Sequence, residues 1–371
     1  MKIQSIELYA YDLTYAHGEY VMSKGRAARH QPSTLVRIVG DNGLDGWGET
    51  ATLGGTYLPT SAATTRAALG ELAPGLIGED PCNPAAAARR MDAALMGQAN
   101  AKSALETACW DLFGKALQLP VAALLGGVLS REFPLYEAVP LGAPEDMAAF
   151  VRRRAATGIR RFQLKVGDDP RADALRVKAA AEVAADAGND DLLIIADANG
   201  GWSLSAATIA VREIAGLDVF IEQPCRDLAD CALISARTAL PMVLDESVVT
   251  LGDLFRAKTE AGAGAVNIKL GRVGGIGAAV AMRNTAHALG MTYCIEDMWG
   301  GDVVSAAVAQ VAASSPPESL MHVSFFNDWT NEHVAGYEPR SKNGRGALPD
   351  GPGLGITVDR GALGPPLAIF S

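Results

Sequence analysis

The sequence predicts an α/β fold, in which a closed barrel of eight parallel strands and intervening helices follows an α+β capping domain. From about residue 133, eight short apolar segments alternate with alanine-rich helical stretches. Five of the segments end in a charged residue, and spacings of 32, 25, 23 and 24 residues separate Lys165, Asp197, Glu222, Asp245 and Lys269. Repeated strand–helix units have this period, and eight of them over roughly 220 residues fit a closed barrel. An open doubly wound sheet is the alternative.

The chain before the barrel predicts strands first and helices afterwards. Alternating polar and apolar residues indicate strands at 2–10 and 34–39, and the turn GDNG at 40–43 leads into a hairpin over GLDGWGET. Helical periodicity follows at 61–73, 84–96 and 101–117. We expect residues 1–127 to form the capping domain, completed by the C-terminal segment 355–371. Residues 128–354 would then form the barrel.

Charge and cysteine content restrict the partners and the compartment. The net charge of −10 disfavours nucleic acids and anionic membrane surfaces, and we interpret the basic run at residues 152–154 as a solvated helix face. No apolar run approaches the 18 residues of a membrane span. The five cysteines lack metal-binding spacing, and the first 13 residues lack the features of a secretory signal. We therefore expect a cytoplasmic protein.

Three successive predicted strands end in a carboxylate, at Asp197, Glu222 and Asp245. Each could simply cap the following helix. In a barrel, however, all three would point into one mouth, where they repel one another unless a cation neutralises them. Carboxylate oxygens suit Mg²⁺, which Mn²⁺ could replace, whereas zinc would prefer His or Cys. The three carboxylates are therefore predicted metal ligands.

Lysines end the second and sixth predicted strands, at Lys165 and Lys269. These strands are four positions apart in an eight-stranded barrel, so the two side chains would face each other across the mouth. Each lysine could form an ordinary salt bridge, but near a divalent cation and a second ammonium group it could also act as a base. A carboxylate substrate held between them could lose its α-proton to form an enediolate. Reprotonation would give an epimer, and loss of a β-leaving group would give an alkene.

The motifs QLKVG, ADANGGW, IEQPC, LDES and IKLGRVGGI occur in the order and spacing of the enolase superfamily, in the branch of mandelate racemase and muconate lactonizing enzyme. The resemblance covers essentially the whole chain. It implies a (β/α)7β barrel of the TIM type, a symmetric homo-oligomer, Asp197, Glu222 and Asp245 as Mg²⁺ ligands, and Lys165 and Lys269 as the acid/base pair. Residues that would support them are Gln163, where the family often has a lysine, together with Asn199, Glu246 and Glu296.

Within this branch the chain is similar to enzymes that act on proline derivatives. These include cis-3-hydroxy-L-proline dehydratases and hydroxyproline betaine 2-epimerases. Asp297 could pair with a ring ammonium, and Trp299 could cover a cation or simply pack the barrel rim. Tyr57 and Phe325 are further predicted substrate-binding residues, whereas His322 is interpreted as a core histidine.

Dehydration of cis-3-hydroxy-L-proline, a small carboxylate, is the predicted reaction. The alternative is 2-epimerisation of hydroxyproline betaine, proline betaine or another amino-acid derivative. Acid-sugar dehydration is disfavoured, because those enzymes more often supply a histidine base. A catalytically silent barrel that only binds a ligand is the non-enzymatic alternative. A phosphate-binding loop at residues 271–277 is also conceivable, although a tight turn that positions Lys269 fits better.

Overall fold

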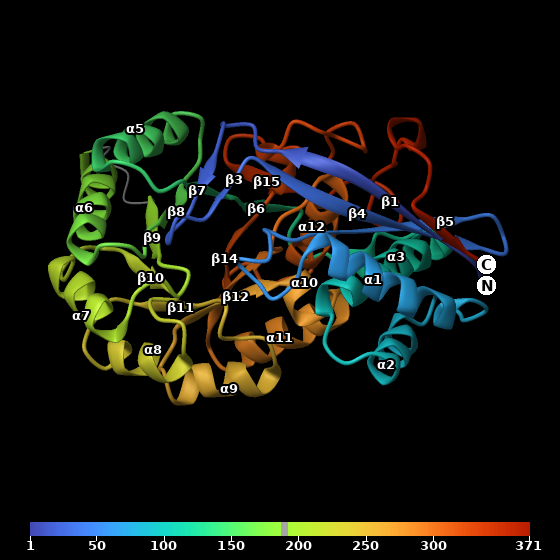
Figure 1. The fold of residues 1–371 in the computed structure, drawn as a ribbon, viewed down its shortest axis with the longest axis horizontal. Coiled ribbons are helices and arrows are strands. Elements are labelled where there is room, and N and C mark those ends of the chain that lie inside the picture. The colour runs from blue at the N-terminus through green and yellow to red at the C-terminus, as the bar shows by residue number, and fades with distance from the viewer. Residues whose placement is uncertain (187–191) are drawn as a thin grey trace.

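The computed structural model describes residues 1–186 and 192–371 of the 371-residue chain. Its central feature is a sheet of eight parallel strands in sequential order from β7 to β14 (Figure 1). The strands are β7 (Tyr136–Val139), β8 (Arg161–Lys165), β9 (Leu193–Asp197), β10 (Phe220–Glu222), β11 (Met242–Leu244), β12 (Ala265–Lys269), β13 (Thr292–Glu296) and β14 (Leu320–Val323). A parallel bridge between Leu135 and Val323 brings the first and last strands together. The predicted barrel is thus confirmed, and the open sheet is excluded.

Helices connect the successive strands on the outside of the barrel. They are α5 (Pro144–Ala155), α6 (Pro170–Asp186), α7 (Leu204–Glu213), α8 (Leu228–Ser235), α9 (Leu251–Thr259), the pair α10 (Leu270–Val273) and α11 (Ile276–Ala288), and α12 (Asp302–Ala313). After β14 the described chain has only the short turns η2 (Phe326–Trp329) and η3 (Arg360–Ala362) and two further strands. Seven strand–helix units and a final strand make this a (β/α)7β barrel.

The N-terminal part forms an antiparallel sheet in the order β16-β1-β4-β5. Its strands are β1 (Ile3–Thr14), β4 (His30–Gly40), β5 (Asp45–Ala51) and β16 (Ala368–Phe370), the last of which places both termini at one end of the sheet (Figure 1). Helices follow at α1 (Ala62–Leu72), η1 (Ala73–Leu76), α2 (Pro84–Ala94), α3 (Ala99–Leu117) and α4 (Val121–Leu124). The three predicted helices and the hairpin are confirmed. Strand β1 runs four residues beyond its predicted end, because its pairing with β4 continues to Thr14 and His30.

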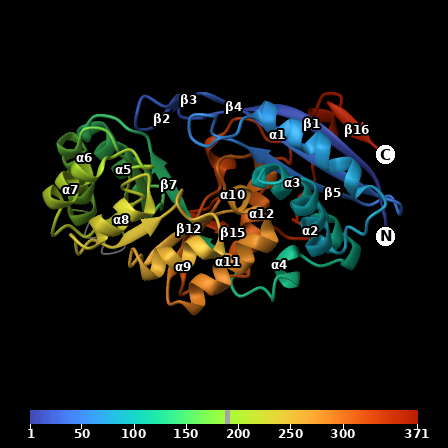
Figure 2. The same ribbon diagram turned by 60° about the horizontal axis from the view of Figure 1, so that its bottom comes forward.

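Short elements link the two parts. A two-stranded ribbon of β2 (Tyr20–Val21) and β3 (Ala27–Ala28) interrupts the path from β1 to β4, and β6 (Glu132–Pro134) pairs with β15 (Arg345–Ala347). Figure 2 shows the ribbon of β2 and β3 extending from the N-terminal sheet toward the barrel. Within residues 1–186 and 192–371, no helix has the length and hydropathy needed to cross a bilayer.

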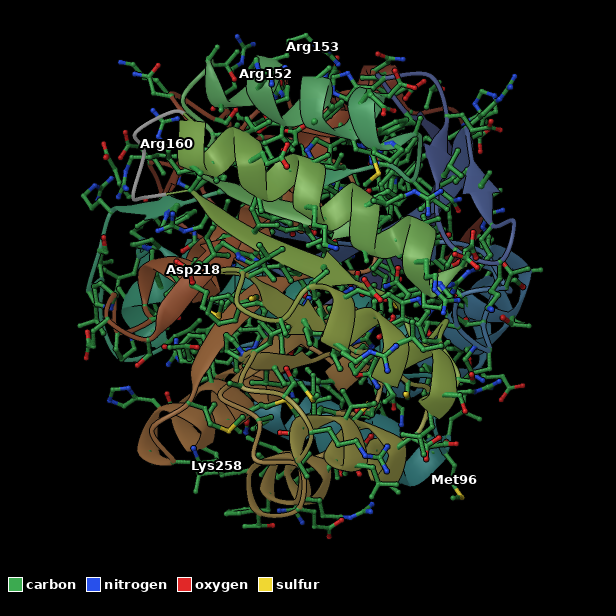
Figure 3. The ribbon with its side chains drawn as sticks, turned by 90° about the vertical axis from the view of Figure 1, so that its left-hand side faces the viewer. Met96, Arg152, Arg153, Arg160, Asp218 and Lys258 are labelled. Atoms are coloured by element: carbon green, nitrogen blue, oxygen red, sulfur yellow. The ribbon has the colours of Figure 1, made fainter. Side chains whose placement is uncertain are left out.

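The basic run on α5 divides into two parts. Arg152 and Arg153 project from the outer surface of the molecule (Figure 3). Arg154 instead donates to the buried carboxylate of Glu137 on β7, at 2.9 Å. The prediction of a solvated face therefore holds for two of the three arginines and is wrong for Arg154, because the helix turns its side chain toward the barrel strand.

Strand β5 packs directly on α3, and two glycines permit this close approach (Figure 2). A Cβ atom at Gly48 would lie 1.9 Å from the Ala104 carbonyl oxygen, and one at Gly46 would lie 2.1 Å from the Ala108 carbonyl oxygen. Both obstacles are backbone atoms, which cannot rotate away. The absence of side chains at Gly46 and Gly48 therefore allows β5 to pack closely against α3.

Gly48→Ala should lower the free energy of unfolding by at least about 2 kcal/mol, because the helix must move away from the strand. Urea unfolding followed by circular dichroism measures the change. Gly70→Ala on α1 is the matched control, since a Cβ there meets nothing within 4 Å. Removing a glycine from a helix should raise stability by about 0.5–1 kcal/mol. Equal stability of the Gly48→Ala variant and the wild type would contradict this packing.

Two buried carboxylates of the N-terminal part bind the starts of barrel helices. Glu49 on β5 accepts from the backbone N–H groups of Gly301 and Val304, at 2.9 and 3.0 Å. Glu106 on α3 accepts from Gly277 N–H at 3.0 Å, at the start of α11. A carboxylate is favourable at a helix N-terminus, where unpaired N–H groups carry partial positive charge. Because Glu106 already takes an N–H of this loop, the phosphate-binding interpretation of residues 271–277 is wrong.

Burial raises the pKa of Glu106 from its ordinary value of 4.5 to about 7. A group whose folded-state pKa is raised contributes stability at low pH that is lost as the pH rises through that pKa. We expect the free energy of unfolding to fall between pH 4.5 and 7.5, with Glu106 accounting for up to about 3 kcal/mol of the fall. In Glu106→Gln the fall should be correspondingly smaller, as measured by urea unfolding at both pH values. An identical fall in the variant would contradict the prediction, and Glu71→Gln on the exposed face of α1 is the control.

Candidate active site

The charged residues predicted at the strand ends lie together at one end of the barrel. Lys165, Asp197, Glu222 and Lys269 are the last residues of their strands, and Asp245 directly follows β11. The register places Lys165 opposite Asp197 and Asp197 opposite Glu222. All five side chains are buried. The parallel sheet thus brings residues far apart in the sequence into one mouth.

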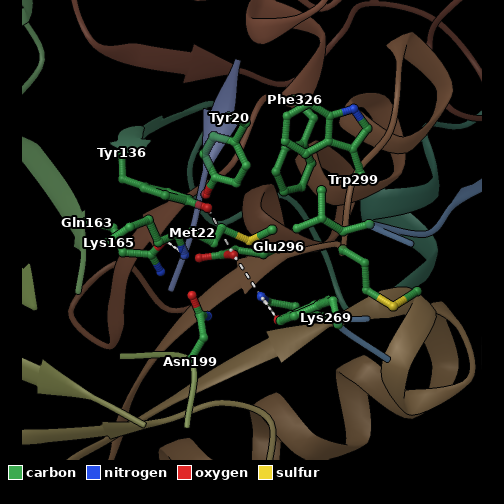
Figure 4. A pocket seen from close by; sticks show the side chains of 13 residues that line it. Tyr20, Met22, Tyr136, Gln163, Lys165, Asn199, Lys269, Glu296, Trp299 and Phe326 are labelled. Carbon is green, nitrogen blue, oxygen red and sulfur yellow. Dashed lines mark hydrogen bonds and ion pairs between the residues drawn. The ribbon is translucent and has the colours of Figure 1, made fainter. Parts of the chain in front are cut away.

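A cavity lies over these strand ends, and both lysines line it (Figure 4). Aromatic and apolar side chains make up most of its wall. The lining residues are Tyr20, Met22, Leu53, Tyr57, Tyr136, Gln163, Lys165, Asn199, Lys269, Glu296, Met298, Trp299 and Phe326.

Lys165 enters the cavity from β8. Its Nζ atom donates to Asp197 Oδ2 at 2.5 Å and to Gln163 Oε1 at 2.7 Å. The Gln163 amide in turn donates to Glu222 Oε2 at 2.8 Å. Gln163 therefore connects the lysine to Glu222, whereas Asp197 contacts the lysine directly.

Lys269 enters from β12, four strands away in the barrel order. Its Nζ atom lies 3.0 Å from Asp245 Oδ2 and 3.7 Å from Glu296 Oε2. It also donates to the Tyr57 hydroxyl at 3.1 Å. Since strands four positions apart face each other in an eight-stranded barrel, the two ammonium groups approach the cavity from opposite sides.

Arg272 is a site residue that we did not predict from the sequence. It forms a buried ion pair with Asp245 and donates to the Tyr57 hydroxyl at 2.9 Å. Burial opposes ionisation of Asp245, but Arg272 and Lys269 outweigh it and hold the pKa of this carboxyl well below its usual range. Arg272 lies three residues after Lys269 on the short helix α10, and this spacing is the signal that could have revealed it.

The three predicted ligands have oxygen donors that fit Mg²⁺. Burial, followed by the charges of Asp197 and Asp245, raises the pKa of Glu222 well above its ordinary value. Within residues 1–186 and 192–371, its two oxygens accept only from the amides of Gln163 and Asn267, at 2.8 and 3.0 Å. Hard carboxylate oxygens with unbalanced negative charge are suitable ligands for a divalent cation.

Two of the three predicted ligands contact lysine ammonium groups in this structure. Within residues 1–186 and 192–371, no three His, Cys, Asp or Glu side chains surround a common point. Asp197 and Asp245 are bonded to Lys165 and Lys269 instead. Asp197 and Asp245 would therefore exchange these lysine contacts for the metal ion when it binds.

Asn199 and Glu246 add buried oxygens next to the predicted ligands. The Asn199 side-chain amide donates to Asp197 Oδ2 at 2.8 Å and to Glu246 Oε1 at 3.0 Å. Among the residues that the structure describes, Asn199 Oδ1 and Glu246 Oε2 have no hydrogen-bond partner. Burial, followed by the charges of Asp245 and Asp197, raises the pKa of Glu246 to about 7.

Glu296 lines the cavity beside Lys269. Its Oε2 atom accepts from the Tyr136 hydroxyl at 3.1 Å. His322 is fully buried behind it, with Nε2 3.5 Å from Glu296 Oε1, and its ring packs on Tyr136 at 4.6 Å. His322 therefore lies outside the wall that a ligand would touch.

Two of the predicted substrate-binding residues lie elsewhere. Asp297 accepts from the backbone N–H of Met298 at 2.7 Å and of Gly271 at 3.2 Å, so it holds the turn behind Lys269 and does not face the cavity. Phe325 packs edge-on against Phe133, at 5.8 Å between ring centroids. Neither residue lines the cavity, whereas Phe326 does, so substrate binding by Asp297 and Phe325 stays a prediction.

The other two predicted substrate-binding residues, Trp299 and Tyr57, both line the cavity. The Trp299 ring packs against Phe326 and Tyr20, at 5.6 and 5.4 Å between centroids. Its indole N–H has no hydrogen-bond partner. The rings of Tyr20, Trp299, Phe326 and Tyr136 give the upper cavity a largely aromatic surface (Figure 4).

Two family models match most of the chain. Residues 8–126 match the mandelate racemase / muconate lactonizing enzyme, N-terminal domain, and residues 146–362 match the enolase C-terminal domain-like family. The chain is 42% identical over the full length of both proteins to the cis-3-hydroxy-L-proline dehydratase of Roseibium aggregatum. It is 32% identical to the N-succinyl-L-Arg/Lys racemase of Bacillus cereus, with 98% of this chain and 97% of that one covered.

Solved structures agree with these matches. A mandelate racemase/muconate lactonizing enzyme from Roseovarius nubinhibens ISM, complexed with magnesium, superposes with a TM-score of 0.95 and 34% identity over 100% of both chains. The N-succinyl Arg/Lys racemase structure from Bacillus cereus superposes with a TM-score of 0.90 and 30% identity, covering 98% of this chain and 97% of that chain.

Proposed function

Because the chain belongs to the mandelate racemase/muconate lactonizing enzyme family of the enolase superfamily, we propose that it removes the α-proton of a proline-type carboxylate with the help of Mg²⁺. The reaction that we infer is dehydration of cis-3-hydroxy-L-proline. The observation that carries this proposal is the pair of buried lysines on strands four positions apart, with three carboxylate-bearing strand ends between them.

The two lysines divide the proton transfers. Burial opposes their protonation, but the charges of Asp197 and Asp245 raise the pKa of Lys165 and Lys269, respectively. Mg²⁺ on these carboxylates would counter that rise and leave one lysine neutral. This lysine takes the α-proton as the Cα–H bond breaks, and the opposite protonated lysine gives a proton to the 3-hydroxyl group. That hydroxyl leaves as water when the C3–O bond breaks, and the resulting enamine tautomerises to a cyclic imine. Asp197, Glu222 and Asp245 would hold the Mg²⁺ ion, whose charge stabilises the enediolate oxygens of the substrate carboxylate.

The cavity wall supports a compact substrate. Aromatic rings and the apolar side chains of Met22, Leu53 and Met298 line the cavity, and such a wall would exclude water around a small bound ring. The relative that is 42% identical over the whole chain is named for this same reaction. We also propose that Mn²⁺ can replace Mg²⁺ and that the enzyme is a cytoplasmic homo-oligomer. Its five unpaired cysteines suit a reducing compartment.

A second candidate function is 2-epimerisation of a betaine such as hydroxyproline betaine or proline betaine. The aromatic surface formed by Tyr20, Trp299 and Phe326 favours it, because ring faces attract quaternary ammonium groups that have no N–H to donate. In that reaction both lysines would act on the same carbon, one on each face.

Proton NMR in D₂O separates the two reactions. The protein with Mg²⁺ is mixed in turn with cis-3-hydroxy-L-proline, L-proline betaine and trans-4-hydroxy-L-proline betaine. Loss of the ring hydroxyl and formation of an imine product from the first compound supports dehydration. Exchange or inversion at Cα of the betaines alone supports the epimerase. No change in any compound would contradict both functions.

A further inference from the structure

Each barrel lysine shares the cavity wall with a tyrosine that comes from the N-terminal part of the chain. Tyr57 lies between β5 and α1, and its hydroxyl is 3.1 Å from Lys269 Nζ. The same hydroxyl accepts from Arg272 Nη2 at 2.9 Å and donates to Asp245 Oδ2 at 3.3 Å. Three partners therefore fix its position, and the Lys269 ammonium also lies 5.5 Å from the centroid of the Tyr57 ring.

Tyr20 has the corresponding place beside Lys165. It lies on β2, is buried, and lines the cavity near Lys165 (Figure 4). The rings of Tyr20 and Trp299 pack together, at 5.4 Å between centroids, on the cavity wall that Lys165 also lines. Backbone contacts hold this segment on the barrel: Leu141 N–H donates to the Val21 carbonyl at 2.9 Å, and Lys24 N–H donates to Asp168 at 2.7 Å.

The hydroxyl groups of Tyr20 and Tyr57 can determine the positions of the lysine ammonium groups. A lysine side chain has four rotatable bonds, and proton transfer requires its nitrogen within hydrogen-bond distance of the substrate carbon's proton. The carboxylates that bind Lys165 and Lys269 lie on the barrel strands, whereas the tyrosine hydroxyls approach from the other part of the molecule. The Lys269 ammonium group is thus held between a strand end and a capping segment, and the Lys165 ammonium group lies in the same cavity as Tyr20 of the other capping segment.

We propose that Tyr57 and Tyr20 are positioning residues, of which Tyr57 holds Lys269 and Tyr20 holds Lys165, each at its own face of the substrate. This inference rests on the proposed function, because it requires both lysines to exchange α-protons. It follows that the two capping segments control opposite faces of the substrate independently. Loss of one hydroxyl then impairs proton transfer on one face only.

The test uses Tyr57→Phe and Tyr20→Phe, which keep the rings and remove only the hydroxyls. L-proline and D-proline are the probes, since they lack a leaving group and present the α-proton to opposite lysines. The rate of α-proton exchange in D₂O with Mg²⁺ is measured for each antipode, with Lys269→Met and Lys165→Met showing which antipode depends on which lysine. Tyr15→Phe is the matched control: Tyr15 lies beside Tyr20, at 5.5 Å between centroids, but does not line the cavity.

We expect Tyr57→Phe to lower kcat at least about tenfold for the antipode that depends on Lys269, with KM within about twofold and the other antipode changed less than about threefold. Tyr20→Phe should show the reverse preference, and Tyr15→Phe should match the wild type. Provided that the wild type exchanges α-protons, three results would overturn this inference. They are equal losses of exchange rate for both antipodes, a change in KM alone, and no change in the exchange rate of either antipode. Absence of exchange in the wild type would instead overturn the proposed function, and this inference with it.

Discussion

Replacing Lys269 by methionine should lower the rate of dehydration by about 10²–10⁴-fold, the usual contribution of a general acid or base. The variant keeps most of the side-chain volume and removes the ammonium group. Arg272 still pairs with Asp245 when Lys269 is absent, so the buried carboxylate retains a cation and the fold should survive. Steady-state kinetics on cis-3-hydroxy-L-proline measure the loss, and thermal unfolding checks the fold. Lys165→Met should cause a loss of similar size.

The control for both variants is Lys258→Met. Lys258 lies on the outer side of the molecule on α9, away from the barrel mouth (Figure 3). The activity of the Lys258→Met variant should equal that of the wild type. Full activity in either Lys269→Met or Lys165→Met would contradict the two-base proposal, because each lysine has a separate proton to transfer.

Asp197→Asn should weaken Mg²⁺ binding by at least about 100-fold, because it removes a charged oxygen ligand; even residues that only support a ligand usually cost 10- to 100-fold. The amide would also place an N–H₂ group close to donors, since Lys165 and Asn199 both donate to this carboxylate. Calorimetric titration of the metal-free protein with Mg²⁺ measures the affinity directly and needs no turnover.

Asp218→Asn, at an exposed position on the outside of the barrel, is the matched control and should leave the affinity unchanged (Figure 3). Removal of the metal with a chelator should abolish activity in the wild type, and added Mg²⁺ should restore it. An unchanged Mg²⁺ affinity in Asp197→Asn would remove this residue from the ligand set.

The barrel was predictable because its strand ends recur at a nearly constant interval. Each interval must hold one helix and one strand, so the spacing of about 25 residues leaves little choice of topology. Polar residues at the end of an apolar strand then have to meet in one mouth. This is why Lys165, Asp197 and Glu222 lie together as the sequence analysis expected, whereas their roles stay predictions until the variants are measured.

The expected and observed positions differ at Asp297 and Phe325, and both differences concern the direction of a single side chain. Successive residues of a strand point to opposite sides, and since Glu296 lines the cavity, Asp297 turns away from it. The same alternation places Gln163 with Lys165 and Asn267 with Lys269, so the bond from Asn267 to Glu222 was predictable. Strand alternation thus accounts for more of the site than the strand ends alone.

No such rule covers the residues after the last strand. Beyond β14 the backbone enters the turn η2, and it turns Phe325 toward Phe133 while Phe326 faces the cavity. Which of two adjacent phenylalanines forms the wall depends on tertiary packing in this turn. The contact of Tyr57 with Lys269 and the place of Tyr20 in the cavity wall likewise arise only when the two parts of the chain are packed together.

The most direct test of the central claim is deuterium incorporation at Cα of L-proline and D-proline by the wild-type protein in D₂O, with Mg²⁺ and after chelation. Two lysines that act on opposite faces with a metal between them should exchange the α-proton of both antipodes when Mg²⁺ is present and of neither when it is removed. Exchange that persists without the metal, or no exchange of either antipode with it, would contradict metal-assisted proton abstraction by Lys165 and Lys269.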